Sequence, residues 1–200
     1  MAKLIFRYAA MCSGKSAEIL QIYRNYQIRN IKGICLIPSI DTASDGAIKS
    51  RFSEIIVPAI KVNKETNLFD IIVKKISISK NIKFIIIDES NFLTKQQAEQ
   101  LGKIVDELNI TVMAYGLMTN FKGELFEGSK RLLEISDRIE QIYVRSRCKC
   151  GKTAIFNARF INGKYLKNGQ EIIIDKKNGT TNNIEYVPMC RKCFNEMIQK

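Results

Sequence analysis

The stretch that decides the fold is Leu4-Ile5-Phe6-Arg7-Tyr8-Ala9-Ala10-Met11-Cys12-Ser13-Gly14-Lys15-Ser16. Its apolar start predicts a strand over residues 4–8, and apolar residues recur at helical spacing after Ser16. A strand, a small-residue loop ending in G-K-S and a helix form a cradle in which backbone N–H groups bind phosphates. In such a cradle Lys15 reaches the β- and γ-phosphates, and Ser16 offers its hydroxyl to Mg²⁺. We therefore expect residues 9–16 to bind a nucleoside triphosphate.

The loop departs from the pattern G-x-x-x-x-G-K-[ST] at its first position, which is Ala9. If this position needs a left-handed backbone, an alanine costs about 1 kcal/mol there. Small residues at positions 9, 10, 13 and 14 still leave room for a phosphate to approach the backbone closely. The alternative interpretation is an ordinary strand–turn–helix in which Lys15 faces solvent.

A second stretch, Phe84-Ile85-Ile86-Ile87-Asp88-Glu89, predicts a strand that is buried on both faces and ends in two carboxylates. A carboxylate at the end of a buried parallel strand beside a phosphate loop is typical of a magnesium site, and Asp88 fits this role. Glu89 points differently, and it would activate water in a hydrolase or accept the proton of a hydroxyl in a kinase. We expect Ser90 and Asn91, which follow, to contact ATP too. The alternative is a strand end that simply meets water.

Short apolar strands alternate with amphipathic stretches along the first 146 residues, which predicts an α/β fold with a parallel sheet. The predicted strands after the first are residues 33–38, 83–88, 110–116 and 141–146. The predicted helices after the first are residues 95–108 and 129–136. The polar, turn-rich residues 39–53 are expected to form a loop.

The sequence changes in character after residue 146, where helical periodicity disappears and glycines separate short β-like pieces. We expect residues 1–146 to form a nucleotide-binding domain and residues 147–200 a small second domain. Two cysteine pairs bracket this second domain: Cys148, Cys150, Cys190 and Cys193. Four thiolates suit a tetrahedral structural zinc ion, although the first pair is one residue tighter than the usual C-x-x-C. Free thiols or disulfides are the alternative.

The composition sets limits on the class of protein. The chain has 200 residues, of which 46% are hydrophobic and 26% charged, as in a folded globular protein. We see no apolar run long enough to span a bilayer and no export signal, so we expect a cytoplasmic protein without a membrane partner. The net charge of +12 is compatible with nucleic acid as a partner. The lysines are spread through the chain, however, and an anionic nucleotide fits the charge equally well, so nucleic-acid binding is not the favoured function.

Five motifs in order resemble those of the cellular (type II) thymidine kinases, a family with a phosphate loop and a zinc ribbon. The family's first motif is matched by Met11, Ser13-Gly14-Lys15-Ser16 and Glu18. Its motif D-E-x-Q-F corresponds to Asp88-Glu89-Ser90-Asn91-Phe92. The remaining matches are Ile40-Asp41-Thr42 with Ser50-Arg51, the segment from Gly116 to Phe126, and Tyr186 with Cys190, Arg191 and Cys193.

This resemblance implies a P-loop NTPase-like parallel sheet and transfer of the γ-phosphoryl group of ATP to the 5′-hydroxyl of thymidine, with deoxyuridine as the alternative substrate, for DNA synthesis by salvage. It implies that Glu89 is the general base, that Ser16 and Asp88 hold Mg²⁺, and that the protein is a homotetramer. It also implies that the second domain closes over the nucleoside, with Tyr186 on its flap. The implied nucleoside-binding residues are Met11, Asp41, Phe92, Leu117, Phe121, Phe126, Asn157 and Tyr186.

Several positions differ from the family pattern. The family arginine after D-T is Ala43 here, and we hypothesise that Arg51 on the same loop supplies the missing charge near the phosphates. Ala9, Ala43 and Met118 suggest one rival, a relative that binds nucleotides but has weak or no kinase activity. The basic charge suggests another rival, a zinc-ribbon ATPase that binds nucleic acid.

Overall fold

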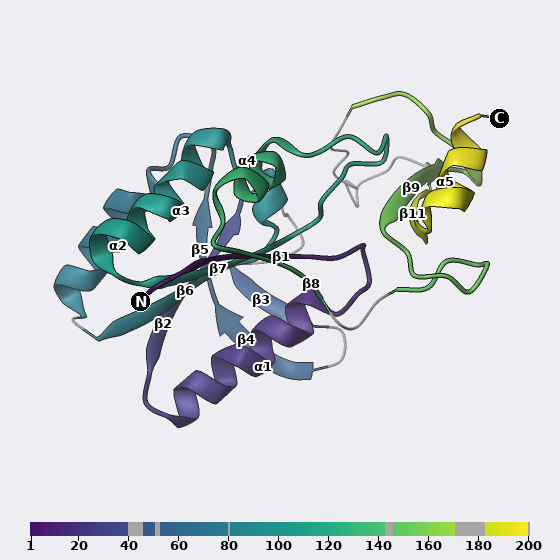
Figure 1. Ribbon diagram of the computed structural model, residues 1–200. Helices are drawn as coiled ribbons and strands as arrows, with labels where there is room; N and C mark the ends of the chain where they lie inside the picture. Colours follow the sequence, from purple (N-terminus) through teal and green to yellow (C-terminus); the bar gives the residue numbers. More distant parts are fainter. Residues whose placement is uncertain (40–45, 51–52, 80, 143–145, 171–182, 200) are drawn as a thin grey trace.

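A computed structural model describes residues 1–39, 46–50, 53–79, 81–142, 146–170 and 183–199 (Figure 1). Its centre is a six-stranded sheet in the order β5-β2-β6-β7-β1-β8, and every pairing in it is parallel. The strands are β1 (Leu4–Tyr8), β2 (Lys32–Pro38), β5 (Ile60–Val62), β6 (Ile82–Ile87), β7 (Thr111–Gly116) and β8 (Arg138–Gln141). The carboxyl ends of β1, β6 and β7 therefore meet at one edge of the sheet, where ligands bind in open α/β folds.

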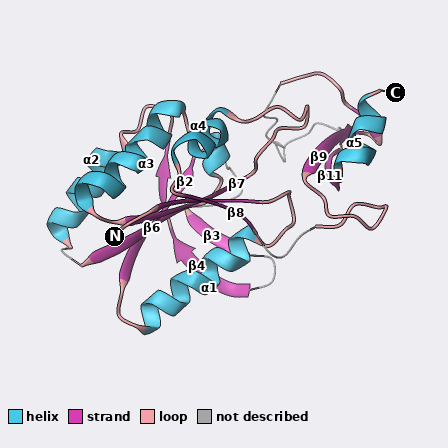
Figure 2. Cartoon of the chain, viewed as in Figure 1, coloured by secondary structure: helices cyan, strands magenta, loops and turns pink. Residues whose placement is uncertain are grey.

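Helices cover both faces of this sheet (Figure 2). One face carries α2 (Leu68–Ile78), α3 (Lys95–Leu108) and α4 (Glu127–Ile135). The other carries α1 (Lys15–Ile28) and an antiparallel pair, β3 (Ala47–Ser50) and β4 (Ser53–Pro58). The covering on both faces explains why the apolar run of β6 is unbroken.

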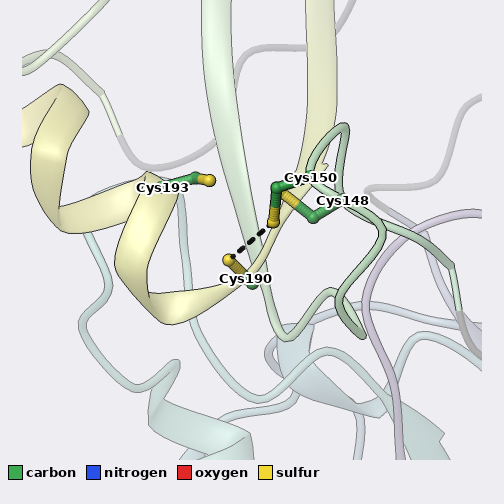
Figure 3. A group of neighbouring side chains, drawn as sticks. All are labelled: Cys148, Cys150, Cys190 and Cys193. Carbon is green, nitrogen blue, oxygen red and sulfur yellow. Dashed lines mark hydrogen bonds between the residues drawn. The ribbon is translucent and has the colours of Figure 1, made fainter.

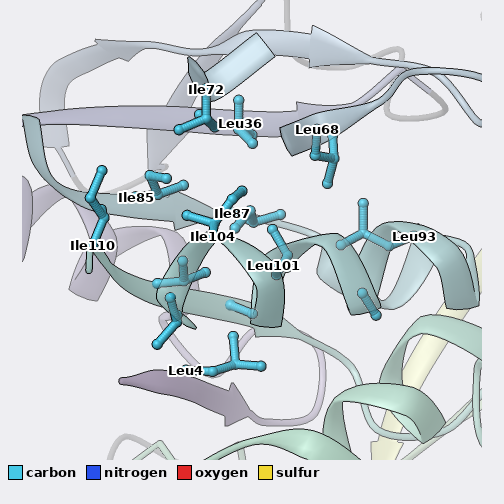
Figure 4. Close-up of a cluster of buried hydrophobic side chains, with 14 of the residues drawn as sticks. Leu4, Leu36, Leu68, Ile72, Ile85, Ile87, Leu93, Leu101, Ile104 and Ile110 are labelled. Carbon is cyan, nitrogen blue, oxygen red and sulfur yellow. The ribbon is translucent and has the colours of Figure 1, made fainter. Parts of the chain in front are cut away.

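Residues of β6 alternate between the two cores. Ile85 and Ile87 pack with Leu101 and Ile104 of α3, as Figure 4 shows, and all four side chains are completely buried. Phe84 and Ile86 point to the opposite core, where α1 lies. This burial fixes the direction in which β6 ends, and thereby the position of the carboxylates that follow it.

Most of the predicted elements of the first domain are confirmed, and helix 95–108 has the predicted bounds. Its start is specified locally, because Thr94 and Gln97 form a reciprocal capping box. Three expectations are wrong or incomplete. Residues 39–53 are not all loop, because β3 and β4 pair and bury Ile48 and Val57 against α1. The strand predicted over residues 141–146 is instead β8, which ends at Gln141, and α2 and β5 were not anticipated.

The chain beyond residue 146 has a small sheet and a core of its own. Strands β10 (Lys164–Tyr165), β9 (Phe156–Ile161) and β11 (Ile184–Met189) pair antiparallel in that order. Helix α5 (Arg191–Ile198) packs on them through Phe194, whose ring stacks on Phe156 at 4.5 Å. This helix contradicts the expectation that helical structure ends at residue 146. The sequence did not reveal it because eight residues are too few for helical periodicity to stand out. The separate core supports our proposal of a second domain over residues 147–200.

Among the described helices, none has the length and apolarity that crossing a bilayer requires.

Candidate functional site

The loop between β1 and α1 has the backbone of a phosphate cradle. Within this loop, Cys12 (φ 59°) and Gly14 (φ 75°) are the residues with left-handed backbone. Ala9 is not among them, and its amide is bonded to the carbonyl of Gly116 at 3.3 Å. The strain that Ala9 would bring at a left-handed position therefore does not arise. The left-handed position before the helix is filled by Gly14, the residue that adopts it with least strain.

Lys15 does not face solvent. Its side chain is 8% exposed, and Nζ donates to the carbonyl oxygen of Ala10, 3.4 Å away in the same loop. The alternative of an ordinary turn with an exposed lysine is therefore wrong. The ammonium group lies over the cradle, at the N-terminus of α1, where its charge and the helix dipole both favour an anion.

Ser16 and Asp88 are in contact, although 72 positions separate them in the chain. The hydroxyl of Ser16 donates to Oδ2 of Asp88 at 3.1 Å, and Oδ1 of Asp88 accepts the amide N–H of Glu89 at 2.9 Å. Asp88 is 4% exposed. A hydroxyl and a buried carboxylate at this spacing are the oxygen donors that a Mg²⁺ ion takes beside a phosphate loop.

Glu89 has an unusual backbone conformation. Its φ is 50° and its ψ 37°, in the left-handed region that costs a residue other than glycine roughly 1–3 kcal/mol. With this backbone Glu89 ends the extended run of β6 and starts the short 3₁₀ helix η1 (Ser90–Phe92). Glu89 is half-buried, whereas Asp88 is buried. Two adjacent carboxylates thus have different environments, which suits different chemical roles.

The loops after β6 and β7 interlock. Oδ1 of Asn91 accepts the amide N–H of Leu117 at 2.9 Å, and Ser129 donates to the carbonyl of Leu117 at 2.6 Å. Gly116 permits this approach, since a Cβ on it would lie 2.8 Å from Oγ of Ser90 and 2.9 Å from the amide nitrogen of Asn91. Oγ of Ser90 and Nδ2 of Asn91 are buried and have no hydrogen-bond partner among the described residues. Asn91 thus holds the loop that begins at Leu117, and Ser90 packs closely against Gly116 at the start of that loop.

The segment 117–126 brings most of the expected apolar residues to this edge of the sheet. It forms a short hairpin in which Thr119 bridges Leu125, and Oδ1 of Asn120 accepts the amides of Lys122 and Glu124. Three of its apolar side chains are buried: Leu117 (9% exposed), Phe121 (2%) and Phe126 (6%). Phe126 meets the ring of Phe92 edge-on, with centroids 5.6 Å apart.

The second domain contacts the phosphate loop directly. The amide of Met11 donates to Oδ1 of Asn157 at 2.8 Å. The side chain of Asn157 is thus hydrogen-bonded to the backbone of the phosphate loop. At the end of the first domain, the hydroxyl of Ser146 donates to the carbonyl of the same Met11 at 2.7 Å. Tyr186 is half-buried on β11, opposite Arg159 of β9. Asp41, Arg51 and Ala43 lie outside the described residues, so their expected roles stay predictions.

The four cysteines of the second domain form one cluster. Their sulfur atoms all lie within 4.8 Å of one another, and the sulfur atoms of Cys150 and Cys190 are 3.5 Å apart (Figure 3). All four are free thiols, so the disulfide alternative is not supported. Zinc–sulfur bonds of about 2.3 Å place tetrahedral thiolates about 3.8 Å apart, which this cluster fits.

A turn at Gly151 (φ 83°) lets the tight first pair contribute both sulfur atoms. The amide of Gly151 bonds to the carbonyl of Cys148 at 2.8 Å, and the amide of Cys148 bonds to Lys152 at 2.9 Å. Burial would raise the pKa of the Cys148 thiol, but backbone hydrogen bonds at Cys150 and Cys190 lower this pKa to about 6. The thiolate form, which metals bind, is thereby favoured.

Arg7, which the sequence reasoning did not single out, anchors the first turn of α1. Its Nη1 donates to Oε1 of Glu18 at 2.6 Å and to the hydroxyl of Tyr115 at 2.8 Å. Its Nε donates to Glu140 at 2.9 Å, and Tyr115 donates to Glu18 at 3.1 Å. Burial raises the pKa of Tyr115, so its hydroxyl stays protonated and remains a donor. The only sequence signal is an arginine inside an otherwise apolar strand.

We expect Arg7→Met to lower the free energy of unfolding by about 2 kcal/mol, because it leaves the carboxylate of Glu18 and the hydroxyl of the buried Tyr115 without their cation. Urea denaturation measures this change. Arg138→Met is the control, since its guanidinium is 56% exposed and 4.0 Å from Glu140. Equal stability losses in the two variants would show that the contacts of Arg7 with Glu18 and Tyr115 stabilise the fold no more than an exposed ion pair does.

Comparison with known proteins gives a consistent result over the whole chain. A family model described as thymidine kinase matches residues 2–194. The thymidine kinase of Francisella tularensis subsp. holarctica is 41% identical, covering 98% of this chain and 98% of the relative. The thymidine kinase of enterobacteria phage T4 is 41% identical, covering 100% and 99%. That of Zymomonas mobilis is 40% identical, covering 99% and 98%.

Among solved structures, the Pif1 helicase from Candida albicans aligns with 70% of this chain and 36% of its own, at 16% identity and a TM-score of 0.43. This similarity is too low to carry an argument.

Proposed function

Because the chain belongs to the thymidine kinase family, we propose that it transfers the γ-phosphoryl group of ATP to the 5′-hydroxyl of thymidine. The observation that carries this proposal is the whole-length match to curated thymidine kinases of about its own size. The geometry is compatible with it, since a phosphate cradle, a hydroxyl–carboxylate pair and a second carboxylate lie at one edge of the sheet.

In this proposal residues 9–16 bind the phosphates of ATP through backbone N–H groups, and the ammonium group of Lys15 neutralises charge on the β- and γ-phosphates. Ser16 and Asp88, which are in contact, would hold Mg²⁺, and the ion would supply further charge neutralisation. Asn91 holds the loop after β7 beside the nucleotide, and the adjacent Ser90 is proposed to contact the nucleotide.

Glu89 is the proposed general base. It accepts the proton of the 5′-hydroxyl as the oxygen attacks the γ-phosphorus, while the bond from that phosphorus to the ADP oxygen breaks. Its half-buried position supports this role, because substrate can reach it while bulk water is partly excluded.

The nucleoside is proposed to bind against Met11, Leu117, Phe121 and Phe126, with Phe92 packed behind Phe126. Asn157 and Tyr186 contribute from the second domain, and a structural zinc ion held by the four cysteines keeps that domain folded. A homotetramer in the cytoplasm is proposed from the family resemblance. Light scattering tests the tetramer.

The two rivals are not favoured. A relative without kinase activity was suggested partly by Ala9, and the ordinary backbone of that residue removes this reason. The hypothesis of a nucleic-acid-binding ATPase depends on the net charge alone, whereas the relatives that match over the whole length are thymidine kinases.

A nucleoside panel with ATP and Mg²⁺ tests the proposal. We expect thymidine to be phosphorylated with the highest kcat/KM, and deoxyuridine to be the best of the others because it presents the same base edge. Deoxycytidine and the purine deoxynucleosides should react poorly. Turnover of ATP that does not depend on any nucleoside would refute the proposal, and so would a preference for another nucleoside.

The magnesium pair gives a separate prediction. Asp88→Asn removes a charged oxygen ligand, so we expect kcat/KM to fall about 10- to 100-fold, with a higher concentration of free Mg²⁺ needed for half-maximal rate. A Mg²⁺ titration at fixed ATP measures this shift. Asp106→Asn, on the exposed side of α3, is the control. An unchanged Mg²⁺ requirement in Asp88→Asn would show that Asp88 does not hold the ion.

A further inference from the structure

Strand β9 has two faces that serve different parts of the molecule. Phe156, Ala158 and Phe160 point to the small core that also contains Cys148 and Cys190. Asn157 and Arg159, which alternate with them, point to the first domain. Both sets of side chains are attached to one backbone, so a shift of the strand in the cysteine core also moves Asn157 and Arg159.

Arg159 makes the more unusual of the two contacts. Its side chain is 0% exposed, and Cζ lies 3.4 Å from the centroid of the Phe121 ring, so the guanidinium is stacked on the ring. Nη1 donates to the carbonyl of Gln170 at 2.7 Å, and the carbonyl of Arg159 accepts the amide of Leu166 at 2.9 Å. The guanidinium is thus held between Phe121 and the segment 166–170 that follows β10.

Gly169 makes room for this arrangement. A Cβ on it would lie 3.0 Å from Nη2 of Arg159 and 3.3 Å from the side chain of Leu166, and its φ is 142°. A residue with a side chain would therefore have to push the guanidinium or strain the backbone. Because Gly169 has no side chain, the backbone of this segment can lie directly against the guanidinium of Arg159.

The energetics argue against a purely structural role for Arg159. Within the described part of the chain, no carboxylate lies within ion-pair distance of it, and Nε and Nη2 have no hydrogen-bond partner. Burying a cation costs several kcal/mol, and a cation–π contact returns about 2 kcal/mol. A leucine or methionine would stabilise this position better. The arginine therefore stabilises the fold poorly but holds the Phe121 ring in one orientation.

We propose that Arg159 is a positioning residue that fixes the ring of Phe121 in the nucleoside site and couples this ring to the four-cysteine domain. This inference rests on the proposed function for the part that Phe121 plays. The guanidinium is planar, so stacking sets the orientation of the ring as well as its distance. Arg159 itself takes no part in phosphoryl transfer, and the phosphate cradle is contacted through Asn157 instead.

Arg159→Lys tests the proposal, because lysine keeps the charge but has no planar group to stack. We expect the KM for thymidine to rise about 10- to 100-fold, with the KM for ATP within about twofold of wild type and kcat little changed. Arg24→Lys, on the exposed surface of α1, is the matched control and should change neither constant. Equal rises in both KM values, or no rise for thymidine, would overturn the proposal.

A second measurement needs no activity and separates this inference from the proposed function. In the absence of substrate, hydrogen exchange of the amides in residues 117–126 should be faster in Arg159→Lys than in wild type, while metal content and the exchange of β6 stay the same. Unchanged exchange in the hairpin would overturn the coupling. If wild type does not phosphorylate any nucleoside but the hairpin exchanges faster in the variant, the proposed function fails and the coupling stands.

Discussion

Replacing Glu89 by glutamine should lower kcat for thymidine phosphorylation about 100- to 10,000-fold, which is the contribution that a positioned general base makes. Glutamine has nearly the shape of glutamate but cannot accept the proton of the 5′-hydroxyl. The KM values for ATP and thymidine should change little, since Glu89 contributes to the transition state and not to ground-state binding. Steady-state kinetics at saturating ATP and Mg²⁺ measure both quantities.

Two controls make this result interpretable. Glu65→Gln removes the same charge from an exposed position and should leave kcat unchanged. Glu89→Asp retains a base but moves it back by one methylene, so its activity should lie between those of wild type and Glu89→Gln. A glutamine variant with more than about a tenth of wild-type kcat would exclude Glu89 as the base.

Cys190→Ser should remove stoichiometric zinc and unfold the small sheet. Structural zinc contributes about 10–16 kcal/mol of apparent binding free energy in small domains, far more than the minor core around Phe194 is expected to supply. Because β9 carries Asn157 and Arg159, thymidine phosphorylation should fall as well. Elemental analysis and hydrogen exchange of β9 and β11 measure the metal and the local unfolding.

Cys35→Ala is the matched control for this prediction. Cys35 is buried on β2, and burial raises the pKa of its thiol to about 12, so it is unsuited to bind a metal. This variant should keep one zinc ion per chain and full protection of β9. One zinc ion retained in Cys190→Ser, or lost in Cys35→Ala, would contradict the assignment of the four-cysteine site.

The sequence predicted the features that depend on local patterns. The cradle around Gly14 and Lys15 follows from spacing, and the burial of β6 follows from its unbroken apolar run. The contact of Ser16 with Asp88 was predictable because parallel strands bring their carboxyl ends to one edge. Two cysteine pairs predicted one cluster, because thiols in close pairs commonly converge on a metal.

Features that depend on distant partners could not be predicted. The strand β8 is specified by pairing with β1, and its sequence, Arg138–Gln141, is too polar to stand out. The pairing of β3 with β4 depends on the apolar surface of α1, and the Arg7 contacts join four separate elements. Nothing near Arg159 in the chain indicates that it stacks on Phe121.

The most direct test of the proposed function is product analysis of the wild-type protein with thymidine, ATP and Mg²⁺. We predict that thymidine 5′-monophosphate and ADP form in equal amounts, and that 5′-deoxythymidine, which lacks the attacked hydroxyl, yields neither. ADP release without a phosphorylated nucleoside, or phosphate found on the 3′-oxygen, would contradict a thymidine 5′-kinase.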